Sequence, residues 1–279
     1  MSGAVQPDTE AARGWHAGIR LGLALRGGRT VLAQRERHGP LSVQRPFYPE
    51  GGVCHVYLLH PPGGVVGGDV LDIEVNLESG ARALVTTPGA TKFYRSDGRP
   101  ALQSQRLRVA EGAVLEWLPQ ESICFPGAEA RMSTLVELHG SARLAMWDIL
   151  CLGRPVIDEP FDQGTLDNRL VIERDGVPLL IDRLRVRPDN RDRLSLMAGL
   201  PVAGTLVISA AGEEEITACR DLLLAEAGDY AGATLVEDLL IVRYLGGSTE
   251  RARRMFTRVW QALRPPGIDS PAVPRIWAT

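Results

Sequence analysis

The sequence predicts a mainly β fold in which short strands stack as rungs, with two helices toward the C-terminal end. From about residue 19 to residue 210, short alternating apolar and polar runs are broken by glycine, proline and Asp-Gly, a pattern typical of many strands. A weak internal repeat runs through the same region, with a period typical of stacked supersecondary units. Two later segments instead place apolar residues three and four positions apart, which favours helices.

Four segments make up the repeat, and their starts lie 32, 29 and 35 residues apart. In order, they are GARALVTT from Gly80, GAVLEWLP from Gly112, SARLAMWD from Ser141 and GVPLLIDR from Gly176. If these rungs stack in register, their last positions meet at one edge of the stack. Those positions are Thr86 and Thr87, Leu118 and Pro119, Trp147 and Asp148, and Asp182 and Arg183.

The two helical segments are residues 213–227 and residues 248–263. The first begins with three glutamates, which favour a helix N-terminus through the helix dipole. The second begins at Ser248, a good N-cap, and is stopped by the Pro-Pro-Gly at 265–267. One further strand is expected at residues 234–245. No linker divides the chain, so we expect residues 1–279 to form one domain, in which the small and polar residues 1–14 are disordered.

Charge and composition point away from nucleic acid and membrane partners. The 31 basic and 34 acidic residues give a net charge of -3, and no basic run resembles a nucleic-acid patch. No stretch reaches the roughly 18 apolar residues that a membrane span needs, and no apolar leader is present. The four cysteines lie far apart and form no C-x-x-C pair. These features predict a cytoplasmic protein with reduced, mostly buried thiols.

Residues 60–69, HPPGGVVGGD, combine two prolines and four glycines and end on the carboxylate of Asp69. A phosphate-binding loop would be followed by a helix and a lysine, whereas the residues that follow alternate like a strand. The segment therefore indicates a tight turn that holds Asp69 in a defined place.

Motifs of known catalytic chemistry are absent from the sequence. It contains no H-E-x-x-H zinc motif, no G-x-S-x-G nucleophile motif and no Walker lysine. One alternative is a metal-storage protein or an enzyme with a site made of Cys54, His55, His60 and Cys124. Against it, Cys54 and His55 are adjacent, so on a strand they face opposite sides and cannot chelate one ion together.

Carboxylates at the ends of apolar strands are more suggestive, although most charged residues are simply solvated. Asp148 is the best exception, because LAMWDILCLG contains one acid among residues that are otherwise apolar or glycine. A buried acid at this position needs hydrogen bonds or a cation.

Several longer motifs resemble the family of the urease accessory protein UreD, called UreH in some organisms. They are RPFYPEG, CHVYLLHPPGGVVGGD, VTTPGATKFYRS, LEWLPQESICF, WDILCLGRP and the terminal PRIWAT, in the family's order from about Ile19 to Thr279. The resemblance implies a β-helix-like stack with two helices, and a scaffold that is not an enzyme. Such a protein binds apo-urease and UreF, and UreF recruits the nickel-carrying GTPase UreG.

The resemblance also implies a water-filled internal passage through which Ni²⁺ moves toward the urease active site, with no tightly bound cofactor. Carried over to this sequence, the passage includes Asp69, Asp148 and Asp182, with Thr86, Thr87 and Thr91 as neutral neighbours. Where relatives often carry glutamate, this chain has the shorter Asp182. Oxygen ligands suit such a route because they hold a divalent cation weakly enough to release it. In the alternative given above, the Cys/His site would instead store nickel and hold it tightly.

Exposed apolar surface commonly marks an interface, and the C-terminal end of the chain offers candidates. We expect the helix at 248–263 and the tail at 274–279 to lie at or near the contact with UreF. The residues expected to take part are Trp260, Ile276 and Trp277.

Overall fold

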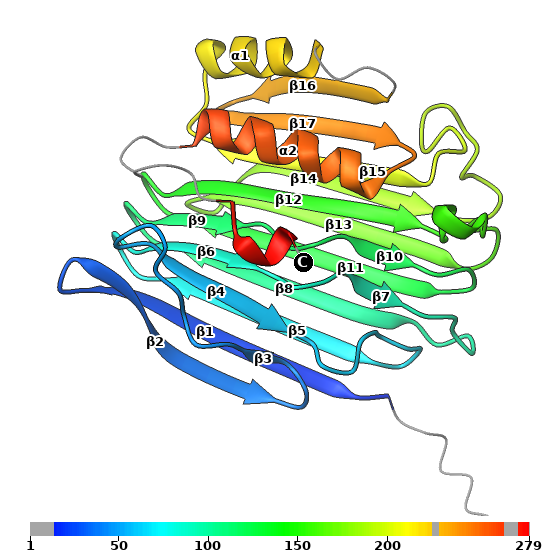
Figure 1. The fold of residues 1–279 in the computed structure, drawn as a ribbon, viewed down its shortest axis with the longest axis horizontal. Coiled ribbons are helices and arrows are strands. Elements are labelled where there is room, and N and C mark those ends of the chain that lie inside the picture. Colours follow the sequence, from blue (N-terminus) through cyan, green and yellow to red (C-terminus); the bar gives the residue numbers. More distant parts are fainter. Residues whose placement is uncertain (1–13, 225–228, 265–272, 279) are drawn as a thin grey trace, which may run out of the picture.

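Two β-sheets lie face to face in this protein, and helices cover the outer side of one of them (Figure 1). The computed structural model describes residues 14–224, 229–264 and 273–278. Strands dominate this part of the chain, which contains two α-helices toward its C-terminal end. The predicted fold class, a mainly β stack with two late helices, is confirmed. Disorder of the N-terminal segment remains a prediction, because residues 1–13 lie outside the described residues.

The first sheet has seven strands. In spatial order they are β14 (Val177–Val186), β13 (Thr165–Arg174), β11 (Glu129–Leu138), β8 (Ala101–Val109), β5 (Val70–Leu77), β1 (His16–Arg26) and β2 (Arg29–His38). The strands from β1 to β13 pair in parallel, whereas β2 and β14 pair antiparallel at the two ends.

The second sheet faces the first. Its main path is β16 (Tyr230–Val236), β17 (Leu239–Gly246), β15 (Val202–Ser209), β12 (Arg143–Leu152), β9 (Val114–Trp117), β6 (Arg82–Thr86), β4 (Cys54–Leu59) and β3 (Ser42–Val43). Two short strands join beside β12, namely β7 (Thr91–Phe93) and β10 (Ser122–Cys124). From β4 to β13 the chain crosses from one sheet to the other and back, which produces the stacked rungs.

Three related turns carry the chain from the first sheet to the second. In two of them a glycine with positive φ directly precedes a fully buried alanine, namely Gly80 before Ala81 and Gly112 before Ala113. In the third, Ser141 stands between Gly140, which also has positive φ, and the buried Ala142. The backbone N–H of each alanine donates to the carbonyl three residues earlier. The turns stack on one another, since Val114 N donates to Ala81 O and Arg143 N donates to Ala113 O. The first three repeat segments are therefore successive rungs.

The fourth repeat segment is not a rung of the second sheet, and this part of the prediction is wrong. Asp175 and Gly176 both have positive φ, 50° and 79°. A two-residue turn of this kind reverses a strand within its own sheet. Strand β14 therefore returns antiparallel to β13 and stays in the first sheet.

The C-terminal third also departs from one predicted strand. The stretch expected as a single strand at 234–245 is a hairpin of β16 and β17, turned at Glu237, whose φ is 52°. No glycine or proline marks this turn, so the sequence pattern did not reveal it. Helix α1 (Glu213–Leu224) starts as predicted, and the expected end at 227 lies outside the described residues.

Helix α2 (Thr249–Leu263) has the predicted bounds, and the Ser248 side chain accepts a hydrogen bond from the N–H of Arg251. Both α-helices and the 3-10 turn η2 (Arg275–Ala278) pack against the outer face of the second sheet. A separate and larger apolar cluster fills the space between the two sheets. Side chains on the second sheet thus alternate between two cores, which explains its nearly continuous apolar strands.

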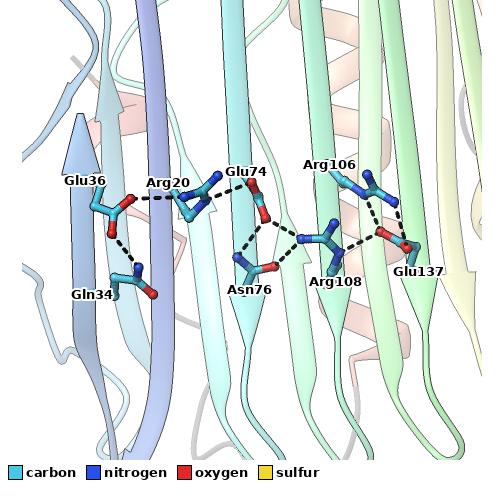
Figure 2. Close-up of polar contacts among 8 residues, drawn as sticks. All are labelled: Arg20, Gln34, Glu36, Glu74, Asn76, Arg106, Arg108 and Glu137. Carbon is cyan, nitrogen blue, oxygen red and sulfur yellow. Dashed lines mark hydrogen bonds and ion pairs between the residues drawn. The ribbon is translucent and has the colours of Figure 1, made fainter. Parts of the chain in front are cut away.

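The outer face of the first sheet is polar, and a chain of ion pairs crosses it (Figure 2). Arg20 bridges Glu36 and Glu74, and Arg108 bridges Glu74 and Glu137. This row of ion pairs is extended by Gln34, Asn76 and Arg106. It therefore joins strands β2, β1, β5, β8 and β11. Because the pairs alternate in sign across neighbouring strands, they satisfy one another on the solvent-facing surface.

Candidate functional site: paired carboxylates between the sheets

Two of the predicted acids, Asp148 and Asp182, line one pocket of about 400 Å³ between the sheets. Asp148 lies on β12 of the second sheet, and Asp182 lies on β14 of the first. Both lie inside their strands, so the prediction that they stand at strand ends is wrong. We call this space the inter-sheet pocket, and its polar lining includes Asp148, Asn168, Asp182, Thr205 and Arg243.

The environment of Asp148 disfavours its charge. Burial raises the pKa of this carboxyl to about 6, and the negative charge of Asp182 adds to the increase. The amide of Asn168 donates a hydrogen bond of 2.5 Å to Asp148 Oδ2, which acts in the opposite direction. The sequence predicted that an acid buried here needs hydrogen bonds or a cation; Asp148 is partly buried, and Asn168 supplies a hydrogen bond.

Asp182 has a cation as its neighbour. Arg243 on β17 places Nη1 2.6 Å from Asp182 Oδ2 and 2.7 Å from the hydroxyl of Thr205. Both charged side chains are partly exposed, with 32% of Asp182 and 46% of Arg243 open to solvent. The pair therefore lies where the inter-sheet pocket opens to water.

Further polar side chains face the inside of the stack on the first sheet. Gln103 and Gln105 on β8 alternate with exposed neighbours, and Gln105 accepts a hydrogen bond of 3.1 Å from the Thr134 hydroxyl on β11. Asn168 on β13 continues this polar row to Asp148. In an otherwise apolar core, such a row is the kind of lining that admits water.

A second pocket, of about 480 Å³, lies near the other end of this row. We call it the loop pocket, because residues of HPPGGVVGGD and of TTPGATK line it together with Gln103. Its polar side chains are His60, Thr87, Thr91, Lys92 and Gln103. Burial lowers the pKa of His60, against the opposing effect of Asp69. Two of the three predicted neutral neighbours, Thr87 and Thr91, thus lie at this pocket.

Asp69 is held by backbone and does not line either pocket. It is 7% exposed, and its two carboxylate oxygens accept hydrogen bonds from the N–H groups of Trp15, at 2.7 Å, and Val66, at 2.9 Å. The glycines beside it are required by close approach: a Cβ on Gly67 would lie 2.5 Å from Ser96 Oγ. The turn predicted from HPPGGVVGGD is present, and it fastens the start of β1 to the loop before β5.

Replacing Asp69 with alanine should destabilise the protein by about 1–3 kcal/mol, because the N–H groups of Trp15 and Val66 lose the buried carboxylate that accepts from them. Asp72→Ala is the matched control, since Asp72 pairs with His16 and both side chains are at least half exposed. That exposed pair should contribute less than about 1 kcal/mol. Urea unfolding followed by circular dichroism measures both values. Equal stability of Asp69→Ala and the parent would contradict this structural role.

Thr86 lies on the outer side of the second sheet, in contact with the C-terminal turn. Its hydroxyl donates to Leu118 O and accepts a hydrogen bond of 2.8 Å from the indole N–H of Trp277. Trp277 also contacts the rings of Trp147 and Trp260, at centroid distances of 5.2 and 5.9 Å. The structure therefore separates Thr86 from Thr87 and Thr91, which were predicted to share a route.

The three residues predicted for partner binding differ in exposure. Trp260 lies on the inner side of α2 and is fully buried, whereas Ile276 and Trp277 are partly buried on η2. The indole N–H of Trp260 donates to Glu116 Oε1 at 2.7 Å. The Trp260 side chain thus anchors the helix, and the surface left for a partner is the outer side of α2 and η2.

Sequence reasoning missed a buried ionic cluster beneath the end of α2. Arg264 donates two hydrogen bonds to Glu50, at 2.6 and 2.7 Å, and two to Glu116, at 2.7 and 2.6 Å. The three side chains are 4% exposed or less, and the Arg264 guanidinium stacks over the Trp260 ring. Arg264 and Glu50 are 214 positions apart, so no local pattern could have indicated the cluster.

The alternative Cys/His site is not assembled. Cys54 faces the core between the sheets, whereas His55 points to the other side and contacts Glu50 at 3.0 Å. Burial raises the pKa of the Cys54 and Cys124 thiols, which disfavours the thiolate that binds metals. Across residues 14–224, 229–264 and 273–278, no group of three or more His, Cys, Asp or Glu side chains is placed to hold a metal ion.

None of the helices in the described ranges is long and apolar enough to cross a membrane.

A family model described as UreD urease accessory protein matches residues 16–278. The urease accessory protein UreD of Klebsiella pneumoniae subsp. pneumoniae is 50% identical over 280 residues, covering 100% of both chains. The Klebsiella aerogenes protein of the same name is 50% identical over 268 residues, covering 96% of this chain and 98% of the relative. That of Alcanivorax borkumensis is 47% identical over 274 residues, covering 96% and 93%.

Proposed function

Because this chain belongs to the UreD family of urease accessory proteins, we propose that it is a non-enzymatic scaffold that helps deliver Ni²⁺ to urease. In this proposal it acts in the cytoplasm, binds apo-urease and UreF, and receives the GTPase UreG through UreF. Nickel is its cargo, so no tightly bound cofactor is required.

The observation that carries the nickel role is the pair of carboxylates in the inter-sheet pocket. Asp148 and Asp182 reach this pocket from opposite sheets, together with the neutral oxygens of Asn168 and Thr205. Carboxylate, amide and hydroxyl oxygens bind a borderline divalent cation weakly compared with thiolate and imidazole ligands. A route for cargo needs this weak binding, because each site must release the ion to the next.

The polar row of Gln103, Gln105, Thr134 and Asn168 supports a continuous route between the loop pocket and the inter-sheet pocket. It extends the passage inferred from the family resemblance to residues that the sequence had not singled out. In this route Thr87 and Thr91 are neutral neighbours at the loop pocket. Asp69 shapes the loop that lines the pocket and contributes charge near His60.

We place the UreF contact on the outer side of α2 and on η2. Helix α2 has charged residues along its exposed side, and Ile276 and Trp277 lie beside it on the surface of the second sheet. Aromatic and arginine side chains are enriched in protein interfaces, so this combination suits a docking surface. Trp260 supports the surface from below.

The test measures nickel delivery and complex formation in the same preparations. Asp148→Asn and Asp182→Asn chains are co-expressed with UreF, UreG and apo-urease, and the complex is recovered by a tag on urease. We expect complex recovery equal to the parent, together with less nickel per urease active site and lower urease activity. The reason is that each substitution removes the negative charge that attracts the cation but keeps the size of the side chain.

A chain lacking residues 274–279 is the reciprocal control, because it should fold to a β-rich protein yet lose UreF. Normal nickel content in both carboxylate variants would refute the route past these acids. Retention of UreF by the truncated chain would refute the position of the contact. Urea or GTP hydrolysis by the purified chain alone would overturn the non-enzymatic assignment.

A further inference from the structure

We propose that Arg243 is a displaceable counter-ion that occupies Asp182 until a divalent cation enters the inter-sheet pocket, and that it thereby sets how readily the cation leaves. This inference rests on the proposed nickel role of the pocket. It adds a regulating residue that neither the sequence motifs nor the family resemblance indicated.

The first support is the position of the guanidinium. Arg243 Nη1 lies 2.6 Å from Asp182 Oδ2 and 2.7 Å from Thr205 Oγ1. Both acceptors are oxygens of the inter-sheet pocket. The cationic nitrogen of Arg243 therefore occupies the position that a metal ion bound by these oxygens would take. A divalent cation and Arg243 therefore compete for the same carboxylate.

The second support is the weak hold on this arginine. The pair is 46% and 32% exposed, and ion pairs of such exposure contribute only about 0–1 kcal/mol. The long apolar stem of arginine allows its charged end to move into water without leaving the surface. Displacement from Asp182 is thus inexpensive, unlike displacement of Arg264, whose side chain is 4% exposed between two carboxylates.

The third support is the charge balance of the pocket. Arg183 also belongs to the lining of the pocket, but its guanidinium is held by two hydrogen bonds to Asp167, at 2.7 and 2.6 Å. Arg183 neighbours Asp182 on β14, so its side chain points to the opposite face of the strand. Arg243 is therefore the arginine whose charge bears directly on Asp182.

The consequence is a pocket that attracts a divalent cation but does not retain it. Arg243 brings one positive charge to the two acids, whereas the charge of Arg183 is paired with Asp167. When a cation binds, the arginine moves outward, and its return to Asp182 helps the cation depart. Removing this charge should tighten cation binding and slow release, because a like charge no longer opposes the metal.

The experiment titrates the purified, untagged full-length chain with nickel sulfate and follows binding by isothermal calorimetry. Arg243→Met, which keeps the apolar stem and removes the charge, should bind Ni²⁺ about tenfold more tightly than the parent. Release to an excess of chelator should slow by a similar factor. Arg243→Lys keeps the positive charge and should stay within about threefold of the parent. Arg185→Met is the matched control for loss of an arginine outside the pocket, because Arg185 lies on the same strand, pairs with Asp167 and is 59% exposed, and the affinity of this variant should not change.

The outcomes separate the counter-ion role of Arg243 from the role of the pocket as a nickel site. The proposal is supported if Arg243→Met no longer tightens Ni²⁺ binding once Asp182→Asn is introduced as well. If Arg243→Met leaves the affinity unchanged or weakens it while Asp148→Asn lowers it, the counter-ion role is wrong and the nickel pocket stands. If no variant alters Ni²⁺ binding, the pocket is not the nickel site and both proposals fail. Thermal unfolding without nickel verifies that each variant is folded.

Discussion

Arg264→Met should reduce the free energy of unfolding by about 3–5 kcal/mol, because it leaves two buried carboxylates without their cation. Glu50 and Glu116 are 1% and 2% exposed, and Arg264 is the residue that bridges them. Hydrogen bonds from Arg264 and His55 outweigh the effect of burial and lower the pKa of Glu50 to about 2. Without Arg264 these hydrogen bonds from the guanidinium are lost, and the Glu50 charge becomes unfavourable.

The matched control lies on helix α2, which Arg264 directly follows. Arg254 pairs with Glu250 on the surface, where the two side chains are 60% and 68% exposed. Arg254→Met should cost less than about 1 kcal/mol. Urea unfolding at pH 7 compares the two variants, and a similar small loss in both would show that the buried cluster contributes little.

The pH dependence of the stability is a second test of the same cluster. In the parent, the lowered pKa of Glu50 contributes stability that is present above the ordinary value of 4.5 and is lost as the pH falls toward about 2. In Arg264→Met the stability should instead rise when the pH is lowered from 7 to 5, because protonation neutralises the buried acid. A triple variant, Glu50→Gln, Arg264→Met and Glu116→Gln, should recover part of the loss, since it leaves no buried charge.

Asp148→Asn should stabilise the protein at pH 7 by about 1–3 kcal/mol and leave it unchanged near pH 4. The folded pKa of Asp148, about 6, lies above the ordinary 3.8, mainly because of burial. A raised carboxyl pKa contributes stability that is fully present below the unfolded value and is lost as the pH rises through the folded value. The cost of the charge is therefore incurred between about pH 4 and pH 6, and asparagine avoids it.

Urea unfolding between pH 4 and pH 7 measures this difference. The charged groups that face Asp148 in the inter-sheet pocket, Asp182 and Arg243, are unchanged in the variant. Asp192→Asn is the control, because Asp192 is 72% exposed and should show no such dependence. A gain that does not vary with pH would mean that asparagine packs better and that the charge of Asp148 is not the cause.

Local patterns predicted the elements that depend on local rules. Gly80, Gly112 and Gly140 have positive φ in the three turns, and each turn ends on a buried alanine. The repeat in the sequence followed directly from this geometry. Ser248 and the apolar spacing behind it likewise located α2 to within one residue.

The errors have equally physical causes. The segment after Gly176 shares its apolar pattern with the rungs, but it follows Asp175 and lacks the buried alanine, and these are the features of a reversing turn. The turn at Glu237 has neither glycine nor proline. An alternating pattern does not tell which sheet a strand joins, so the meeting of Asp148 and Asp182 across two sheets came from the fold and not from the repeat.

In the candidate site, too, some residues were predicted from the sequence and others depend on the fold. The family resemblance named Asp148 and Asp182, and the apolar surroundings of Asp148 had already set it apart. Arg243, Asn168 and Gln105 were missed because their importance depends on which strands face each other. The membership implied by the motifs is confirmed by the family match over residues 16–278.

The buried cluster at Arg264 also bears on how the chain is made. Each rung contacts the next one in sequence, so rungs can form in order as the polypeptide leaves the ribosome. Glu116 must wait for Arg264, which follows 148 residues later, and at about 5–20 residues per second this delay is roughly 7–30 s. Until then the nascent protein exposes two acidic side chains where its finished interior will be, and water solvates them. Closure of the outer core is therefore a late event of biosynthesis, completed only when the last helix arrives.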